Sequence, residues 1–314
     1  MWKNFGKALL FLTVFAVLFL GISPVFVPKD NSGGAGIHVP NAKGFLGEPA
    51  DTLDVLFLGD SEAYSSFIPL EIWEEYGITS YVCSNGDQMI YECASYLQWF
   101  LKNQSPKVVV LETNTLYRSY TLAQLLRHGC EERLPYLRYH DRWKWLRMED
   151  LGSPVEFTRI VPNKGYLYFT ESTVTGMEGY MAYSDEVDPV PYLSTIFVKQ
   201  MENVCREQGI QLILVSAPSP TNWNYYYHNG VQALAQELKL PYIDMNLMPV
   251  EIPIDWNCES YDGGDHLNYG GACKVTAYMG KYLWDTGLFT DKRELASYSD
   301  WNAAAAAFRE NPQR

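Results

Sequence analysis

The residues best suited to chemistry in this sequence are a serine and a histidine near opposite ends of the chain. Ser61 ends a Gly-Asp-Ser tripeptide that directly follows the apolar run 55–58. His266 lies in an Asp-His-Leu-Asn tetrapeptide at 265–268. A serine hydroxyl is a weak nucleophile until a neighbouring base takes its proton. The pair therefore predicts covalent catalysis, with Ser61 as the nucleophile and His266 as the general base.

A strand followed by a helix must position Ser61. The run 55–58 is rich in residues that favour strands, and the residues after Ser61 are typical of the start of a helix. In an open α/β sheet, ligands bind beyond the carboxyl ends of the strands. The first turn of a helix presents backbone N–H groups to an anion. We therefore expect Ser61 at the edge of a cleft, with its own amide as one donor of an oxyanion hole.

The two blocks, in this chain order, resemble the first and last blocks of the SGNH/GDSL hydrolases. The sequence is most similar to the membrane-anchored, cell-surface SGNH proteins of Gram-positive bacteria, which are related to the D-alanyl-lipoteichoic acid D-type protein and the alginate O-acetylation proteins. The resemblance covers about residues 50–285. It implies a flavodoxin-like three-layer α/β/α fold with a parallel sheet, and serine chemistry without a cofactor or a metal ion.

The same resemblance implies an acid three residues before the histidine, where this chain has Gly263. Asp262 lies one residue earlier and would reach the imidazole if Gly263 and Gly264 made a tight turn. Asp265 is adjacent to the histidine, and its side chain could instead cap the following helix. Both aspartates remain candidates for the acid that orients His266.

The resemblance also implies two further oxyanion donors beside the Ser61 amide. A glycine after the second strand corresponds to Gly86, and an asparagine after the third strand corresponds to Asn114. The chain lacks the Gly-x-Asn-Asp block that usually carries this asparagine. An Asn-Gly pair is also common in an ordinary turn, so Gly86 has a purely structural alternative.

The loop 216–224 follows another predicted strand and should face the same cleft. Its Asn222 and Trp223, with the tyrosines at 225–227, could contact a sugar ring or an acylated glycan, because aromatic rings offer flat apolar faces. The alternative is that these rings only pack in the interior. His128, His140 and His228 have no comparable neighbours and are expected to be structural.

The amino terminus predicts a membrane anchor. Residues 8–27 carry no charge, and about twenty such residues span a bilayer. Lys3 and Lys7 precede them, which places the amino terminus in the cytoplasm and the rest of the chain outside. We expect an N-terminal signal-anchor transmembrane helix at 1–28, so that the protein is a single-pass protein of the cell membrane; a cleaved signal peptide is the alternative.

Strands and helices alternate from residue 51 onward, which predicts a parallel sheet with helices on both faces. We expect an extracytoplasmic, flexible linker at 29–50, the hydrolase-like domain at 51–288, and a polar tail at 289–314 that is either a weakly held helix or disordered. Residues 117–190 break the alternation and are expected to form an insertion that acts as a lid or as one wall of the cleft; the alternative is an irregular packed subregion. Expected strands are 55–58, 79–83, 107–112, 210–215 and 241–244; expected helices are 68–76, 89–102, 191–208, 229–239 and 269–285.

The net charge and the cysteines of the chain limit the ligands and the cross-links that it can have. The chain carries a formal net charge of -13, or -15 without its first 27 residues. A chain this acidic does not bind nucleic acid through its phosphates and should not be attracted broadly to anionic lipid. The six cysteines have no CxxC spacing, which argues against a zinc site. They predict either one or two disulfides or scattered buried thiols.

Two functions remain for this sequence. The first is a serine-dependent O-acyl esterase or acyltransferase that acts on a cell-envelope polysaccharide or teichoic-acid-like polymer. The second is a weakly catalytic or non-catalytic partner of a membrane-bound O-acyltransferase, which would hold or present the glycan. The serine and histidine favour the first function, and the displaced acid keeps the second open.

Overall fold

The computed structural model describes residues 2–176 and 179–312. The chain divides into two compact units. Unit 1 contains Met1–Pro40 and Ser119–Arg159, and unit 2 contains Asn41–Arg118 and Ile160–Arg314. The predicted insertion at 117–190 is therefore shared, because its first part belongs largely to unit 1 and its second part to unit 2.

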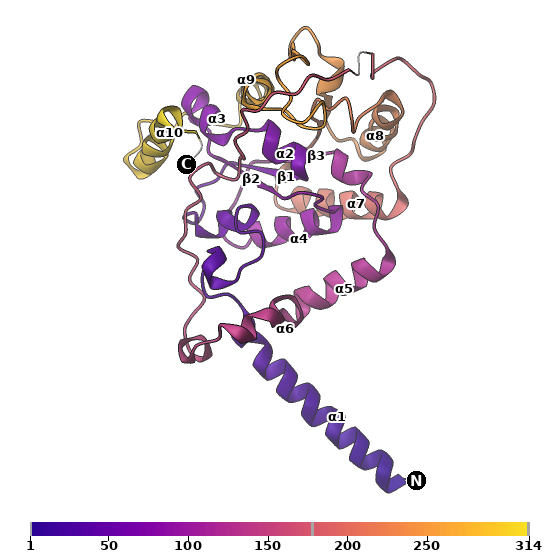
Figure 1. Ribbon diagram of the computed structural model, residues 1–314, viewed down its shortest axis with the longest axis vertical. Helices are drawn as coiled ribbons and strands as arrows, with labels where there is room; N and C mark the ends of the chain where they lie inside the picture. The colour runs from indigo at the N-terminus through magenta and orange to yellow at the C-terminus, as the bar shows by residue number, and fades with distance from the viewer. Residues whose placement is uncertain (1, 177–178, 313–314) are drawn as a thin grey trace. The chain divides into compact units, whose positions relative to one another are not determined.

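Unit 2 is built on a parallel sheet of five strands in the order β2-β1-β3-β4-β5 (Figure 1). Each strand is short and almost fully buried, which is typical of parallel sheets that are covered on both faces. In β1, which lies between β2 and β3, Leu58 is in register with Cys83 on one side and Leu111 on the other. The strands are β1 (Val55–Gly59), β2 (Ser80–Ser84), β3 (Val108–Glu112), β4 (Gln211–Ser216) and β5 (Tyr242–Asp244).

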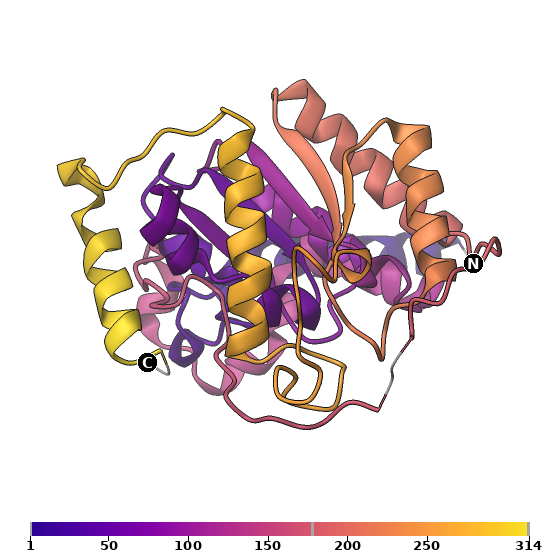
Figure 2. The same cartoon turned by 90° about the horizontal axis from the view of Figure 1, so that it is seen from above.

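Helices cover both faces of this sheet, as the alternation of apolar segments predicted. On one face α3 packs against α9 and α10, and on the other α4 packs against α7 (Figure 1). Figure 2 shows α9 lying over the strands. The helices of unit 2 are α2 (Ser61–Ser66), α3 (Pro69–Tyr76), α4 (Ile90–Phe100), α7 (Tyr192–Glu207), α8 (Tyr225–Leu238), α9 (Tyr269–Asp285) and α10 (Ser299–Glu310).

The hydrophobic core holds the end of β1, which is followed by α2 at Ser61. Phe57 is fully buried, and its ring stacks on Phe67 at a centroid distance of 4.5 Å. Val275 and Met279 of α9 are buried in the same cluster. Burial of such side chains contributes roughly 1.5–3 kcal/mol each, so the strand end and α2 are held by the best-packed part of unit 2.

Two terminal segments are more ordered than the sequence indicated. Ala42–Gly47, in the predicted flexible linker, forms a short 3₁₀ segment in which Phe45 is buried against β2. In the predicted tail, α10 buries Trp301 and Phe308, and Trp301 packs on Trp73 with ring centroids 5.4 Å apart. Aromatic contacts that are distant in the sequence hold both segments, and a local reading of composition does not reveal such contacts.

Unit 1 contains the long apolar helix and a set of short helical segments. Residues 4–26 have the length and composition of a membrane-crossing segment, with a mean hydropathy of 2.5; a signal sequence has the same properties. The helices of unit 1 are α1 (Trp2–Ile22), α5 (Leu122–Arg133) and α6 (Pro135–Tyr139), with 3₁₀ segments at Ser23–Phe26, Gly33–Ala35, His140–Lys144 and Met148–Leu151.

All six cysteines are free thiols, so the disulfide alternative is wrong; the alternative of scattered buried thiols holds for half of them, because Cys130 and Cys258 are exposed and Cys273 is partly buried. Three of them are buried: Cys83, Cys93 and Cys205. Burial raises the pKa of the Cys93 thiol to about 12. A thiol of this kind stays protonated and packs as a small apolar side chain.

Candidate active site

Ser61 lies where β1 gives way to α2, as expected. Gly59 is needed at this point, because a Cβ there would lie 2.7 Å from the Cβ of Glu112 on the neighbouring strand. Asp60 then caps the helix by accepting the amide N–H of Glu62 at 3.1 Å. Ser61 is the first residue of α2 and is only 5% exposed. The serine therefore stands at a buried helix N-terminus at the carboxyl end of β1, an interior strand of the sheet.

The loop before α9 holds His266 in a fixed orientation. Nδ1 of His266 lies 2.6 Å from Oδ2 of Asp262, and the His266 amide donates to Oδ1 of the same carboxylate at 2.8 Å. Gly263 and Gly264 have φ values of +84° and +100°, which a residue with a side chain rarely adopts. These glycines form the tight turn that lets an aspartate four residues earlier meet the imidazole.

Asp265 is the less suitable partner of the two predicted acids. Its Oδ1 lies 3.6 Å from Nδ1 of His266, beyond hydrogen-bond length. The carboxylate of Asp265 instead accepts a hydrogen bond from the side-chain amide of Asn222. It does not cap α9, because Asn268 does so by accepting the amide N–H groups of Gly270 and Gly271. Geometry thus favours Asp262 as the orienting acid.

The second ring nitrogen of His266, Nε2, has a different environment from Nδ1. Among the described residues, Nε2 of His266 is buried and has no hydrogen-bond partner. The imidazole stacks between Tyr64, at a centroid distance of 6.4 Å, and Tyr261, at 5.4 Å. Burial raises the pKa of Tyr64, and a hydrogen bond with the Ser61 side chain opposes that rise. Tyr64 therefore contacts both the predicted nucleophile and the predicted base.

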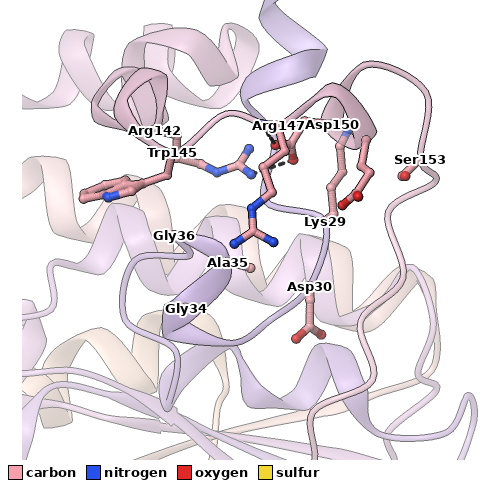
Figure 3. Close-up of a pocket in the computed structure, with 11 residues that line it drawn as sticks. Lys29, Asp30, Gly34, Ala35, Gly36, Arg142, Trp145, Arg147, Asp150 and Ser153 are labelled. Carbon is pink, nitrogen blue, oxygen red and sulfur yellow. Dashed lines mark hydrogen bonds and ion pairs between the residues drawn. The ribbon is translucent and has the colours of Figure 1, made fainter.

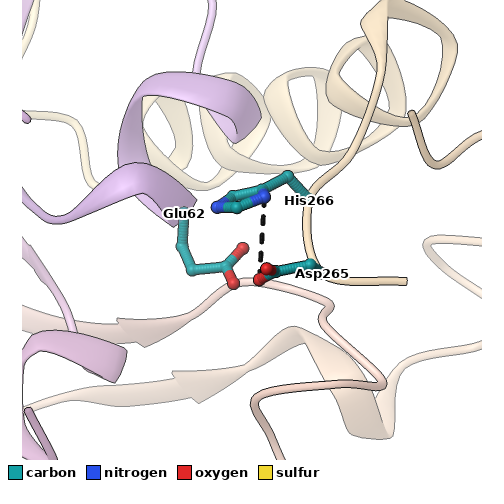
Figure 4. A group of neighbouring side chains, drawn as sticks. All are labelled: Glu62, Asp265 and His266. Carbon is teal, nitrogen blue, oxygen red and sulfur yellow. Dashed lines mark ion pairs between the residues drawn. The ribbon is translucent and has the colours of Figure 1, made fainter. Parts of the chain in front are cut away.

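Glu62 adds a buried carboxyl group beside the histidine (Figure 4). Glu62, Asp265 and His266 each place one potential ligand atom within 4.8 Å of the others. Asn222 donates to Oε1 of Glu62 at 2.7 Å, whereas Oε2 has no partner among the described residues. Burial raises the pKa of Glu62 well above its usual value, and the nearby charge of Asp60 adds to this effect. The Asn222 amide bridges both carboxyl groups.

Asp60 and Asn114 form the opposite side of the site. The side-chain amide of Asn114 donates to Oδ2 of Asp60 at 2.9 Å, and Nε of Arg118 donates to the same oxygen at 2.6 Å. Burial raises the pKa of Asp60, while the charge of Arg118 acts against that rise. A primary amide has two N–H donors, so the bond to Asp60 orients Asn114 and uses one of them. Asn114 thus lies beside the Gly-Asp-Ser turn, where an oxyanion donor is needed.

Gly86 lies in the exposed turn that follows β2. A Cβ on Gly86 would lie 4.0 Å from the hydroxyl of Tyr64, the residue that also contacts Ser61. Nη1 of Arg118 lies 2.6 Å from Oδ1 of the adjacent Asp87, and this ion pair ties the turn to Asp60. All three predicted oxyanion donors therefore come from strand ends that meet around α2.

Trp223 is not placed to contact a substrate. Its side chain is buried, and its indole N–H donates to Oδ2 of Asp244 at 3.0 Å. The ring packs against Tyr117 and Tyr227 in edge-to-face geometry. The expectation that Trp223 offers a ring face to a glycan is wrong in this structure, because the indole completes an internal network. Asn222, by contrast, joins the site through Glu62 and Asp265.

The second part of the predicted insertion braces the histidine loop. The amide of Thr173 donates to the carbonyl of Ser260 at 2.8 Å, and the amide of Thr175 donates to the carbonyl of Trp256 at 3.0 Å. Phe169 stacks on Tyr261 with ring centroids 4.1 Å apart. Residues 169–175 thus run along the loop that carries His266.

Several side chains around the site had no distinct signal in the sequence. Tyr64 and Glu62 follow Ser61 but belong to no recognised motif, and Arg118 stands in a segment without a clear period. Tyr180 and Trp256 line a pocket of about 400 Å³ together with Pro218, Met245, Asn246, Pro249 and residues 252–255. Oδ1 of Asn246 accepts the Tyr180 hydroxyl and the Ser219 amide, both at 3.0 Å, and Oγ of Ser219 donates to the carbonyl of Asp265 at 2.7 Å, so the pocket is linked to the loop that carries His266. Of these side chains, only Glu62 could have been singled out from the sequence, because it directly follows the Gly-Asp-Ser block.

The chain matches no protein-family model, and no curated protein matches it. Solved structures with a related backbone are GDSL-like lipases, acylhydrolases and esterases. A GDSL-like lipase from Bacteroides thetaiotaomicron has a TM-score of 0.37 and 12% identity, covering 81% of this chain and 95% of that chain. A lipase/acylhydrolase from Enterococcus faecalis has a TM-score of 0.38 and 10% identity, covering 74% and 97%.

An esterase from Pseudoalteromonas has a TM-score of 0.39 and 10% identity, covering 74% of this chain and 98% of that chain. Similarity at this level assigns neither a family nor an activity to this chain. What the chain can do is therefore argued from its own residues.

Proposed function

We propose that this chain is a membrane-anchored serine esterase or acyltransferase of the SGNH/GDSL type. Its substrate would be an O-acylated cell-surface polysaccharide or teichoic-acid-like polymer. One observation carries the proposal: Asp262 holds Nδ1 of His266, while among the described residues the buried Nε2 has no hydrogen-bond partner, and the imidazole stacks on Tyr64 of the helix that begins at Ser61. An imidazole held in this way is a general base that waits for a proton donor.

The reaction that follows from this arrangement has two halves. Oγ of Ser61 attacks the ester carbonyl as its proton moves to Nε2 of His266, and the negative charge on the carbonyl oxygen is stabilised by the Ser61 amide, Gly86 and Asn114. The C–O bond to the polymer then breaks, and the imidazolium returns the proton to the leaving oxygen. Water or a second hydroxyl group attacks the acyl-enzyme and gives its proton to His266; the acyl C–O bond to Ser61 then breaks, and the imidazolium returns the proton to Oγ of Ser61.

The environment of the site suits a neutral ester better than an anionic substrate. Three buried carboxyl groups, from Asp60, Glu62 and Glu112, lie around the serine, and Arg118 forms an ion pair with Asp60. Burial raises the pKa of Glu112 well above its usual value. The neighbouring pocket lined by Tyr180 and Trp256 offers aromatic surface for a sugar ring or an acyl chain.

Anchoring in the membrane is part of the proposal. The apolar segment at 4–26 would remain as a signal anchor and hold the catalytic unit outside the cell, where a surface polymer is available. A membrane-bound O-acyltransferase would be a natural partner, because it could supply acyl groups to the same polymer.

The proposal is tested with a fluorophosphonate probe on the full chain, read by intact mass. We expect one adduct on the wild type and none on Ser61→Ala. Ser65→Ala is the matched control, because Ser65 is a buried serine on the same helix whose hydroxyl donates to the backbone carbonyls of Ser61 and Glu62. An adduct that survives in Ser61→Ala, or a folded wild type that does not react, would contradict the proposal. In the second case the glycan-presenting function would lead, and binding of acylated glycans would be measured next.

A further inference from the structure

Segment 143–151 of unit 1 exposes four large apolar side chains to solvent. Trp143, Trp145, Met148 and Leu151 are each between 62% and 82% exposed. Lys144 and Arg147 alternate with them, and Nζ of Lys144 lies 5.9 Å from the ring of Trp143. Tryptophan side chains interleaved with long basic side chains are typical of the membrane–water interface, where the ring is half apolar and the cation reaches the headgroups.

Contacts within unit 1 fix this segment to the end of the apolar helix. The ring of Tyr136 packs edge-to-face on Phe19, with centroids 4.9 Å apart, and on Phe26 at 4.7 Å. The amide of Tyr136 also donates to Oγ of Ser23 at 3.0 Å. Tyr136 therefore contacts three residues of the last two turns of the segment that has the length to cross a membrane.

Arg142 forms the second attachment. Nη1 of Arg142 donates to the carbonyl oxygens of residues 25, 26 and 27, at 3.3, 2.9 and 3.0 Å. Nη2 of Arg142 donates to Oδ1 of Asp150 at 2.9 Å, and Oδ2 of Asp150 accepts the amide of Arg147. Arg142 is buried, so this link does not depend on a solvated side chain. The carbonyls at the end of the apolar segment are thereby joined directly to the segment that carries the tryptophans.

We infer that the surface formed by Trp143, Trp145, Met148 and Leu151 lies in the outer interface of the lipid bilayer. The inference rests on the proposed anchoring of residues 4–26. About twenty apolar residues span the hydrocarbon, which is roughly 30 Å thick, and the headgroup layer adds only about 5–7 Å on each side. Phe26 then lies near the hydrocarbon boundary, and side chains tied to residues 25–27 lie within the headgroup layer.

The charge of unit 1 agrees with this location. Unit 1 contains ten Lys or Arg and seven Asp or Glu, a net charge of +3, whereas unit 2 contains fourteen and thirty, a net charge of -16. The acidic character of the whole chain therefore does not describe the part that would meet lipid. A pocket of about 400 Å³ beside Trp145 and Arg147 is lined by three cationic and three anionic side chains, so it does not itself indicate an anionic ligand (Figure 3).

The test is fluorescence quenching of the full chain in phosphatidylcholine vesicles that contain acyl-brominated phosphatidylcholine. Every protein carries Trp2→Phe, because Trp2 lies at the start of the apolar helix. We expect the brominated lipid to quench the parent protein, and the double variant W143F/W145F to lose most of the quenched signal. Trp284→Phe is the matched control, because Trp284 is a partly exposed tryptophan of unit 2; its removal should leave the lipid-quenched signal unchanged.

An alkaline wash of the vesicles distinguishes a failure of the proposed anchoring from a failure of the interfacial surface. If the wash releases the protein, the proposed anchoring is wrong and the interfacial surface loses its basis. If the protein stays in the vesicles and W143F/W145F is quenched as strongly as the parent, the anchoring stands and the interfacial surface is wrong.

Discussion

Unit 2 contains two histidine–aspartate pairs that are alike in length and differ in everything around them. Nδ1 of His266 lies 2.6 Å from Asp262, and Nδ1 of His228 lies 2.8 Å from Asp244. Asp244 is buried and accepts five hydrogen bonds, from the side chains of Trp223, His228 and Tyr242 and from the amide and side chain of Asn246. Asp262 instead pairs with the ring of His266 and accepts the amide of the same residue. Its other contact among the described residues is a weak one with Ser260.

The comparison shows that a histidine–aspartate contact is not evidence of catalysis. A network that satisfies a buried carboxylate stabilises one structure and leaves little for a substrate to bind. Among the described residues, the buried Nε2 of His266 has no partner, and an unsatisfied polar atom of this kind is destabilising unless a ligand or a reaction uses it. The pairs therefore predict opposite responses to the same substitutions.

The largest difference is expected when each histidine is removed. His266→Ala should lower the rate of fluorophosphonate labelling and of ester hydrolysis by about 10³-fold or more, because the base that accepts the Ser61 proton is lost. His228→Ala should keep the rate within about threefold and lower the free energy of unfolding by about 1–3 kcal/mol, because it removes a donor to buried Asp244. Equal losses of activity in both variants of equal stability would remove the distinction.

The two aspartates near His266 should then separate by a smaller factor. Asp262→Asn keeps the shape but turns an acceptor into a donor at Nδ1, so kcat should fall by about 10²–10⁴-fold. Asp265→Asn should cost less than about tenfold, because Asp265 lies outside hydrogen-bond length of the ring. A larger loss in Asp265→Asn than in Asp262→Asn would reverse our assignment of the acid.

Much of this site could be predicted from the chain because its positions are set by local rules. The apolar run 55–58 had to form a buried strand, and the two glycines before Asp265 allowed Asp262 to turn back toward His266. The burial of Trp223 could not be predicted in this way, since aromatic loop residues look the same whether they line a cleft or complete an internal network. The exposure of a ring is decided by partners such as Asp244 and Tyr117, which are distant in the sequence.

Glu62 is a second buried acid of unit 2 that can be compared with Asp244. Asp244 has five donors, whereas Glu62 has one donor, Asn222, and burial raises the pKa of Glu62 well above 4.5. Below pH 4.5 this carboxyl is protonated in the folded and unfolded states and costs nothing. As the pH rises toward and through the raised folded pKa, the unfolded state ionises first, and the folded state loses stability.

Glu62→Gln should remove that pH-dependent cost while keeping the oxygen that accepts from Asn222. We expect the melting temperature of the variant to exceed that of the wild type by more at pH 8 than at pH 4.5. In a large domain, a change of roughly 2–4 °C in melting temperature corresponds to 1 kcal/mol. Differential scanning fluorimetry at both pH values measures the effect. The same difference at both pH values would show that ionisation of Glu62 does not limit stability.

The smallest expected effect concerns Trp223 and tests whether the Asp244 network stands apart from the reaction. Trp223→Phe keeps an aromatic ring but removes the N–H that donates to Asp244, so the free energy of unfolding should fall by about 1–3 kcal/mol. Because the ring is buried, KM and kcat for an O-acetylated glycan should stay within about twofold of wild type. Trp256→Ala is the informative counterpart, since Trp256 lines the pocket that is linked to the His266 loop, and its loss should raise KM. If Trp223→Phe raised KM while Trp256→Ala did not, the glycan would contact the internal network, and the two histidine–aspartate pairs would belong to a single site.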